Sequence, residues 1–411
     1  MSTGRRTADI AIVGGGIIGI ACAYELSARK AGKIVLFDKN IPGSGTTSGS
    51  GGVICTHDLS RLFAQMSLVG FVRIKELRDQ HGFHFNQWGR LELSRRPGGP
   101  SSEPSWFEEA FGGLREDIYE HEVLTVTDLE ERFPWLSVPG VTGATYSPNQ
   151  GFVDTYELLS LYQRLAVGTG LVEVWPNTPV LEIRRSSGRV KSVVTRRGEW
   201  HVGAVLNAAG PWGKKAARLA GVDVPLEPQR VQVCIATAFD DGRDSPPHIS
   251  GTDIHIEGER IWLRGEVGGT VLLAEHHDAT TAGPPVDPDL VARSTDDDFA
   301  SKVDRAAREA LGFERAVFLN GWTCVYGTTR DGHPLIGEDP SLDGFYHVIG
   351  CNGHGMTCHA GYAIAATSAI LDDGAPVDLS PWTGKSEVLD VPSLAVDRFE
   401  RNQALSIELV A

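Results

Sequence analysis

The chain has 411 residues, of which 41% are hydrophobic and 22% are charged, a balance that predicts a globular protein and excludes a disordered or fibrous one. A formal net charge of −15 argues against nucleic acid or an anionic membrane as a partner, because both repel an acidic surface. The length favours two domains, and we expect the partner to be a small molecule.

The amino terminus runs from two arginines into an apolar segment without a small-residue cleavage site, so we expect no signal peptide. We find no apolar stretch of membrane-spanning length in the sequence. Six cysteines are spread along the chain, which fits a reducing compartment better than a disulfide framework. These features predict a cytoplasmic protein.

The first motif is DIAIVGGGIIG at residues 9–19, an apolar strand that runs into Gly14, Gly16 and Gly19 and then into a helical pattern. The first glycine permits a tight turn, the second lets a pyrophosphate approach the backbone, and the third allows close helix packing. A second predicted strand ends at Asp38, whose carboxylate should accept hydrogen bonds from a ribose diol. The pattern predicts a site for NAD or FAD; a glycine-rich turn of another α/β protein is the alternative.

Three further segments have the same glycine-rich character. GSGTTSGSGGVI (43–54) is interpreted as a loop that lines a cofactor, with a flexible linker as the alternative. Residues 204–221 and 344–374 each read as a strand, a small-residue turn and a helix. The turn within 344–374 is expected to point backbone N–H groups and the N-terminus of the following helix toward a bound group that becomes anionic.

Taken together, these segments resemble the FAD-dependent D-amino acid oxidase superfamily, in the branch that holds glycine oxidase, monomeric sarcosine oxidase and dimethylglycine dehydrogenase. The resemblance rests on their order and combination, and the segments are GGGIIG…FDK, GTTSGSGGV, VLNAAGPW, TTRDGHPLIG and GCNGHGMT. They span nearly all of residues 9–373.

The resemblance implies an α/β fold, with a Rossmann-type FAD-binding domain and a second, α+β substrate domain built on an antiparallel sheet. The FAD-binding domain would be discontinuous and comprise 7–86, 151–226 and 325–378. The substrate domain would comprise 87–150 and 227–324, and residues 379–411 would form a C-terminal tail without a family counterpart. Residues 261–277 are predicted to form a hairpin with a Gly-Gly turn, and 276–289 an exposed loop.

The resemblance also implies a set of cofactor-binding residues. The loop around 353–357 would stabilise negative charge at the N1/C2 carbonyl edge of the flavin. The expected FAD-binding residues are Gly14, Gly16, Ile18, Gly19, Asp38, Lys39, Thr46, Thr47, Ser48, Gly51, Gly52, Val53, Val180, Gly210, Trp212, Cys324, Gly353, His354, Gly355, Met356 and Thr357.

Tyr326, Arg264 and His354 are the candidate catalytic residues. Glycine oxidase has a carboxylate-binding arginine where this chain has Tyr326, so the substrate carboxylate would need Arg264 or Arg230 instead. A surface salt bridge is the other interpretation of Arg264. Tyr326 could orient a substrate amine or aromatic group, and His354 could bind the cofactor or be held by the backbone of its loop.

Thr357 stands where sarcosine oxidase uses a lysine. Cys324 falls on the position at which monomeric sarcosine oxidase carries FAD through a thioether, while many relatives have glycine there. A covalent flavin and a buried packing thiol are both left open. Soft metal ligation by Cys351, Cys358 and their neighbouring histidines His354 and His359 is not expected, because no second distant pair accompanies them.

We therefore expect an FAD-dependent oxidoreductase that oxidises the C–N bond of an amine or of a secondary or D-amino acid to an imine. Oxygen is the expected acceptor and hydrogen peroxide the product. The alternatives are a dehydrogenase of the same fold with a protein acceptor or a 2-hydroxy acid substrate, and a flavin-binding subunit of a larger complex.

Overall fold

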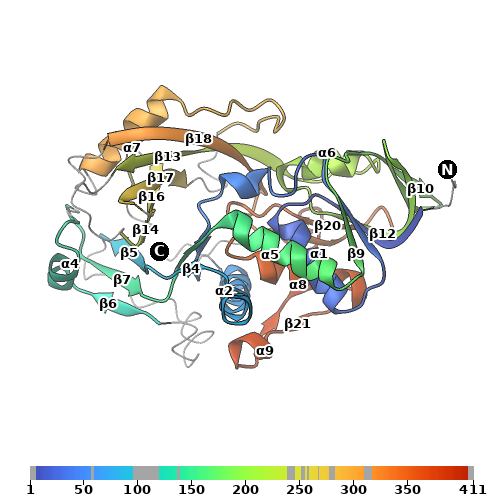
Figure 1. Ribbon diagram of the computed structural model, residues 1–411, viewed down its shortest axis with the longest axis horizontal. Helices are drawn as coiled ribbons and strands as arrows, with labels where there is room; N and C mark the ends of the chain where they lie inside the picture. Colours follow the sequence, from blue (N-terminus) through green and yellow to red (C-terminus); the bar gives the residue numbers. More distant parts are fainter. Residues whose placement is uncertain are drawn as a thin grey trace.

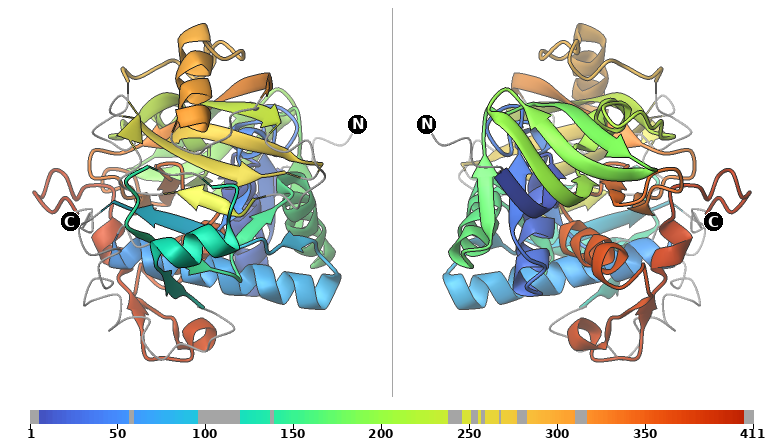
Figure 2. Two further views of the ribbon diagram at one scale, coloured as in Figure 1. Left: turned by 90° about the vertical axis from the view of Figure 1, so that its left-hand side faces the viewer. Right: turned by 90° about the vertical axis from the view of Figure 1, so that its right-hand side faces the viewer.

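The computed structural model describes residues 6–56, 60–95, 120–136, 139–237, 246–250, 255–256, 259–266, 268–276, 283–309 and 317–405. Within these residues the chain forms two large sheets that lie side by side, with helices packed against both (Figures 1 and 2).

The first large sheet has eight strands and a parallel centre. β1 (Arg6–Val13) lies between β2 (Ile34–Phe37) and β12 (Gly198–Asn207), and all three run in the same direction. The remaining strands continue the sheet outward and are β9 (Val172–Trp175), β10 (Val180–Ser186), β11 (Arg189–Thr195), β19 (Leu335–Glu338) and β20 (Phe345–Ile349). Since β1, β2 and β12 are parallel, their carboxyl ends and the turns that follow them meet at one edge.

Four helices pack against one another over this sheet, and they are α1 (Ile17–Ala28), α2 (Arg61–His81), α5 (Thr155–Gly168) and α8 (His359–Leu371). Small residues allow close contacts between them. A Cβ on Gly70 of α2 would lie 1.9 Å from the carbonyl oxygen of Thr357, which lies two residues before the first residue of α8. The start of α8 is therefore fixed against α2. On the other side of the sheet, the turn η2 (Gly210–Trp212) and α6 (Gly213–Arg218) pack beside a core that includes Trp200 and Phe345.

The second large sheet has nine strands and is antiparallel except for the parallel pair β5–β14. Its strands are β5 (Arg90–Ser94), β6 (Glu122–Leu124), β7 (Gly143–Ser147), β13 (Glu227–Thr237), β14 (His248–Ser250), β15 (His255–Ile256), β16 (Glu259–Gly265), β17 (Thr270–His276) and β18 (Val317–Thr328). β16 and β17 form the predicted hairpin, although residue 267 in its turn lies outside the described residues.

The two faces of this sheet differ in what they pack against. On the outer face Leu263, Leu273 and Phe299 share a core with α7 (Asp297–Glu309) and α4 (Val126–Arg132). On the inner face the strand register brings Trp322, Val233, Ala274 and Trp262 into one row. Trp322 donates a hydrogen bond from Nε1 to the carbonyl oxygen of Gly49 at 3.1 Å, so the inner face lies against the glycine-rich loop of the other half.

Three short strands join the halves, namely β3 (Val53–Ile54), β4 (Phe85–Asn86) and β8 (Gly151–Val153). Residues 379–405, for which we expected no counterpart in the family, fold back onto the half of the molecule that contains the eight-stranded sheet. They contain α9 (Ser380–Thr383), β22 (Val388–Leu389) and η3 (Val391–Leu394), and β22 pairs with β21 (Val377–Asp378).

The predicted α/β architecture with a second, antiparallel sheet is confirmed. The expected domain boundaries stay a prediction, and β18 runs unbroken through the one placed at 324/325. Among the described residues, no helix combines the length and the apolar character needed to cross a membrane.

Candidate functional site

The turn between β1 and α1 has the close contacts that its glycines permit. Gly14 adopts a φ of +112°, and a Cβ on it would lie 2.4 Å from the carbonyl oxygen of Ala208. A Cβ on Gly19 would lie 1.9 Å from the carbonyl oxygen of Gly14, so the helix packs directly on the turn. Thr47 accepts a hydrogen bond from the first helical N–H, that of Ile17, at 3.1 Å. The glycine-rich loop thus caps the helix that begins the cofactor motif.

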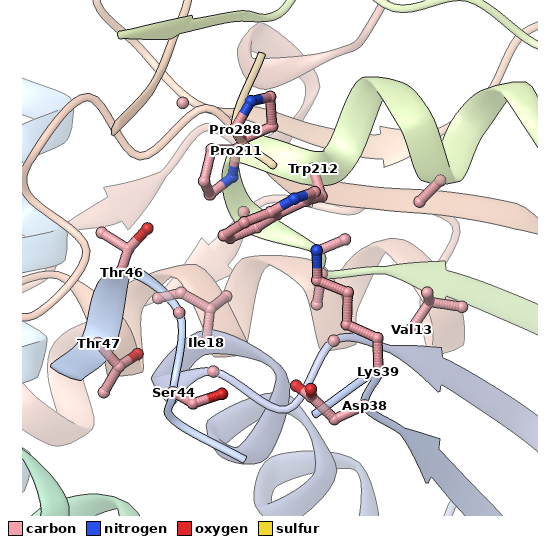
Figure 3. Close-up of a pocket in the computed structure, with 18 of the residues that line it drawn as sticks. Val13, Ile18, Asp38, Lys39, Ser44, Thr46, Thr47, Pro211, Trp212 and Pro288 are labelled. Atoms are coloured by element: carbon pink, nitrogen blue, oxygen red, sulfur yellow. The ribbon is translucent and has the colours of Figure 1, made fainter. Parts of the chain in front are cut away.

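A cavity of about 450 Å³ opens at the N-terminus of α1, at the edge where the parallel strands end (Figure 3). This volume is in the range of ordinary ligand pockets. Most of the predicted FAD-binding residues line it, and they are Gly14, Gly16, Ile18, Asp38, Lys39, Thr46, Thr47, Val180, Gly210, Trp212, Gly353, Gly355 and Met356.

Asp38 stands at the end of β2, as predicted, and its carboxylate is already oriented. One oxygen accepts a hydrogen bond from the backbone N–H of Gly15 at 2.8 Å and the other from that of Asn40 at 2.7 Å. Burial raises the pKa of Asp38, and these two hydrogen bonds lower it in part. Each carboxylate oxygen keeps a further lone pair that a ribose hydroxyl could use. The chain therefore fits a dinucleotide at this end of the cavity.

A buried polar network fixes the opposite wall. The side-chain amide of Asn207 donates to the carbonyl oxygen of Gly213 at 2.8 Å and lies 3.2 Å from Nδ1 of His347. The other ring nitrogen of His347 lies 3.2 Å from the Asp339 carboxylate. With Nε2–H donating to Asp339, Nδ1 is free to accept from Asn207. This network holds the turn that carries Trp212.

Residues that the sequence did not identify complete this wall. Pro288, Asp289, Arg293 and Lys215 all line the cavity. The Asp289 carboxylate accepts hydrogen bonds from Lys39 and Lys215, both at 2.6 Å, and from Nε1 of Trp212 at 2.7 Å. Burial raises the pKa of Asp289, but the three donors outweigh it and hold the pKa far below its ordinary value. The sequence did not predict that Asp289 contacts these donors, because 276–289 was predicted only to be an exposed loop.

Tyr326 lines the other end of the cavity, beside the loop at 353–356. A Cβ on Gly353 would lie 2.7 Å from a ring carbon of Tyr326, so the ring lies flush with that loop. Burial and the neighbouring Cys324 raise the pKa of Tyr326, which keeps its hydroxyl protonated and able to donate. Tyr326, Cys324 and Trp322 alternate along β18 and therefore face the same way.

Cys324 faces the glycine-rich loop but does not line the cavity. Its Sγ lies 3.3 Å from the point that a Cβ on Gly49 would occupy. Burial raises the pKa of this thiol to about 12, so it is neutral at physiological pH. The position is compatible with a packing thiol and with a reacting one.

Several other predicted residues do not line the cavity, namely Gly19, Ser48, Gly51, Gly52, Val53, His354 and Thr357. Thr357 donates a hydrogen bond to the carbonyl oxygen of Val53 at 2.8 Å. The ring of Trp262 would lie 2.7 Å from a Cβ on Gly51. His354 is buried, with its ring 4.7 Å from that of Phe63.

Neither candidate arginine lines this cavity, but they differ in place. Arg230 forms an ion pair with Asp296 at 2.5 Å. Arg264 is only 5% exposed and lies 4.0 Å from the ring centroid of Phe152, with its guanidinium bound to Glu266. Its Nε is buried without a hydrogen-bond partner, and desolvation lowers its pKa.

His359 is one of the four side chains that were considered as metal ligands and set aside. Both of its ring nitrogens are engaged, Nδ1 with the carbonyl oxygen of Met356 and Nε2 with the Tyr162 hydroxyl, each at 2.8 Å. Within the described ranges no cluster of three or more His, Cys, Asp or Glu side chains is arranged to hold a metal ion.

Comparison with known proteins agrees with this geometry. The chain is 23% identical to monomeric sarcosine oxidase of Bacillus sp. (strain B-0618) over 380 residues, 90% of this chain and 94% of the relative. It is 24% identical to FAD-dependent oxidoreductase domain-containing protein 1 of Xenopus laevis, over 89% of this chain and 80% of the relative. It is 25% identical to mouse mitochondrial sarcosine dehydrogenase, but spans only 38% of that longer protein.

Solved structures show the same fold. L-proline dehydrogenase from P. horikoshii superposes with a TM-score of 0.79 at 21% identity, covering 97% of this chain and 99% of that one. Glycine oxidase from Geobacillus kaustophilus superposes with a TM-score of 0.71 at 20% identity, covering 93% of this chain and 99% of that one. The FAD dependent oxidoreductase (DAO) family profile matches residues 9–369. The chain therefore belongs to the FAD dependent oxidoreductase family, as its glycine-rich segments predicted.

Proposed function

We propose that the protein oxidises the C–N bond of an amine or of a secondary or D-amino acid to an imine and passes the electrons to oxygen. The observation that carries the proposal is the place of Tyr326, a residue of the nine-stranded sheet that lines the same cavity as the Gly14–Gly16 cradle. A substrate between that sheet and the cofactor would meet both. The names of several relatives, sarcosine oxidase, glycine oxidase and sarcosine dehydrogenase, support an amine substrate.

The proposed reaction balances without a metal. The substrate loses a hydride equivalent from the carbon next to nitrogen and a proton from the nitrogen, and oxygen takes up the two electrons and two protons as hydrogen peroxide. FAD supplies the two-electron chemistry, while the chain supplies position and electrostatics. Tyr326 would orient the amine through its protonated hydroxyl, and its raised pKa extends the pH range over which the hydroxyl keeps its proton. The loop that ends in Gly355 and Met356 would stabilise negative charge at the start of α8.

Arg264 is our candidate for binding a substrate carboxylate. Its alternation with Trp262 on β16 places both side chains on the inner face, and Trp262 contacts the glycine-rich loop at Gly51. A buried guanidinium with an unpartnered Nε can still donate to a carboxylate. Glu266 already neutralises part of its charge, so a substrate would share the guanidinium with Glu266 rather than replace it. His354, buried beside Phe63, would support the loop next to the cofactor.

A thioether between Cys324 and the flavin 8-methyl carbon is a further part of the proposal. The alignment of Trp322, Cys324 and Tyr326 on one side of β18 directs all three at the loops that we assign to the flavin. Forming that bond replaces a thiol S–H and a methyl C–H, so two electrons must pass through the flavin to oxygen. The raised pKa of the thiol disfavours the thiolate, and bound cofactor would have to lower that pKa first.

Two other functions share the same site. A dehydrogenase would pass electrons to another protein or would act on a 2-hydroxy acid, and a flavin-binding subunit would have little catalysis of its own. The name of one relative, mitochondrial sarcosine dehydrogenase, favours the first of these. The predicted cytoplasmic location remains a prediction.

An anaerobic reduction screen tests the substrate class. Purified holoprotein is mixed with N-methyl amino acids, D-amino acids and their matched 2-hydroxy acids, and loss of the flavin absorbance is followed. We expect bleaching by a nitrogen compound and none by its hydroxy analogue; bleaching only by hydroxy acids would refute amine oxidation. Admission of oxygen should then restore the colour and give one peroxide per imine. Reoxidation only by an added electron acceptor would instead indicate a dehydrogenase.

A further inference from the structure

The segment from Val286 to Arg293 is bound to the nine-stranded sheet and forms part of the wall of the cofactor cavity. It belongs to the connection between β17 and α7, yet Pro288, Asp289 and Arg293 line the cavity together with turns of the eight-stranded sheet, the glycine-rich loop and Tyr326 of β18. Figure 3 shows Pro288 on the same side of the cavity as Trp212 and Pro211, across from Asp38. We call residues 286–293 the strap.

Both ends of the strap are bound to the nine-stranded sheet. The N–H of Val286 donates to the carbonyl oxygen of Pro228 on β13 at 2.8 Å. The carbonyl oxygen of Arg293 accepts from the N–H of Thr323 on β18 at 3.1 Å. These backbone contacts hold the ends in place, so a change in the middle need not release the whole segment.

The middle of the strap is held to the cofactor half through the Asp289 side chain. Its carboxylate accepts hydrogen bonds from Lys39, Lys215 and the indole N–H of Trp212, and each of these three residues also lines the cavity. Lys39 lies 4.0 Å from the ring centroid of Trp212, so the donors also contact one another. Asp287 accepts a second hydrogen bond from Lys215. One carboxylate therefore connects the strap to three side chains around the dinucleotide end.

The contacts of Asp289 with Lys39, Lys215 and Trp212, which we call the joint, are suited to breaking and forming again. The side chains of Lys39, Lys215 and Asp289 are 40%, 43% and 44% exposed, so water and salt screen the ion pairs. The three contacts act together on one carboxylate, which makes the joint stronger than an isolated surface pair. Because the donors come from two places in the sequence, Lys39 and the segment that carries Trp212 and Lys215, only the closed fold brings all of them to Asp289.

We propose that the strap is a gate for the cofactor and that Asp289 keeps it closed. FAD enters and leaves when Asp289 separates from Lys39, Lys215 and Trp212, and the closed strap slows both steps. Asp289 is thus a positioning residue, which acts on the lysines and the indole and not on the reacting atoms. The proposal rests on the FAD family and is independent of the substrate.

The test measures FAD association and release separately. All variants carry Cys324→Ala, so that no covalent bond interferes with the release of FAD. Apoprotein is mixed with FAD, and quenching of flavin fluorescence gives the association rate; dilution of the holoprotein with an apoflavoprotein trap gives the dissociation rate. The variants compared are Asp289→Asn, Asp287→Asn and, as a control, Asp296→Asn. Asp296 lies on the same connection but pairs with Arg230 away from the cavity.

For Asp289→Asn we expect both rates to rise about tenfold, the change that loss of a small charged network produces, with Kd altered less than about threefold. Asp287→Asn should shift both rates in the same direction by less, and Asp296→Asn should stay within about twofold. Rates for Asp289→Asn within about twofold of the parent would overturn the proposal. A rise in the dissociation rate alone would also overturn it, because Asp289 would then stabilise bound FAD without gating entry.

Discussion

The guanidinium of Arg398 binds both carboxylate oxygens of Asp331, with Nε 2.8 Å from Oδ2 and Nη2 2.7 Å from Oδ1. Both side chains are almost fully buried, at 1% and 3% exposure. Arg398 also donates to the carbonyl oxygens of His333 and Pro334. Burial raises the pKa of Asp331, but Arg398 outweighs it and the pKa ends below its ordinary value. The C-terminal segment thus holds the loop that connects β18 to β19.

We predict that Arg398→Met is strongly destabilising, because it leaves the Asp331 carboxylate buried without its partner. The expected loss in the free energy of unfolding is about 3–5 kcal/mol, measured by urea titration of the holoprotein. The double variant Asp331→Asn, Arg398→Met should recover part of this loss. Arg401→Met removes an exposed pair with Asp397 and should cost less than about 1 kcal/mol. Equal losses for the two single variants would contradict the prediction.

The glycines of the first turn predict two different outcomes. A Cβ on Gly19 would meet the carbonyl oxygen of Gly14 at 1.9 Å, so Gly19→Ala should impair both folding and FAD binding. A Cβ on Gly16 would lie 3.4 Å from Oγ1 of Thr47, an ordinary contact, yet it would point into the space of the pyrophosphate.

We therefore expect Gly16→Ala to leave the Tm of the apoprotein within about 2 °C of wild type while it weakens FAD binding at least tenfold. Calorimetry and flavin titration check the two halves of this prediction. Gly168→Ala, at the end of α5 where a Cβ would meet no atom within 4 Å, is the matched control and should change neither. Wild-type affinity in Gly16→Ala would refute the assignment of the cradle.

Local sequence was enough to predict the cradle, because the turn, the helix start and Asp38 lie within one βαβ unit and their chemistry depends on neighbours in the chain. It was also enough to predict the β16–β17 hairpin and the alternation that places Arg264 on one face. The family resemblance added the glycine-rich loop and the turn at Gly210.

Residues whose roles depend on distant partners could not be predicted in this way. Asp289 meets Lys39 across 250 positions and Arg398 meets Asp331 across 67. An aspartate in an exposed loop and an arginine near the C-terminus carry no local sign of such contacts. The partner of Arg264 was missed for a related reason: Glu266 is two positions away, just beyond the end of β16, and the sequence does not show that the guanidinium binds it.

Cys324→Ala separates the two interpretations of this thiol. If Cys324 carries the flavin, acid precipitation of the wild type leaves the yellow colour in the pellet, whereas the variant releases it to the supernatant. Cys234→Ala is a control, because Cys234 is also buried on the same sheet but faces the outer core. Colour in the wild-type supernatant would make Cys324 a packing residue, and the variant would then lose only about 1 kcal/mol or less of stability.

His359 predicts how stability depends on pH. Nδ1 faces the carbonyl oxygen of Met356, which can only accept, so this nitrogen carries the proton and Nε2 accepts from the Tyr162 hydroxyl. The ring is therefore neutral in the folded protein, and burial lowers its pKa from 6.5 to about 4. Below about pH 6.5 the unfolded chain takes up a proton that the folded chain refuses, so stability falls as the pH is lowered toward 4.

The expected contribution is roughly 3 kcal/mol, fully present above pH 6.5 and lost progressively by about pH 4. We compare wild type with His359→Gln by urea unfolding from pH 7.5 to 4.5. Other groups titrate in both proteins, so the informative quantity is the difference between them, which should shrink as the pH falls. Tyr162→Phe keeps the imidazole and should retain the wild-type slope at a lower stability. If the difference in unfolding free energy between wild type and His359→Gln stays constant over this pH range, His359 is not the group responsible for the pH dependence. Met356, whose carbonyl oxygen accepts from His359, lines the cofactor cavity, so FAD affinity is measured over the same pH series.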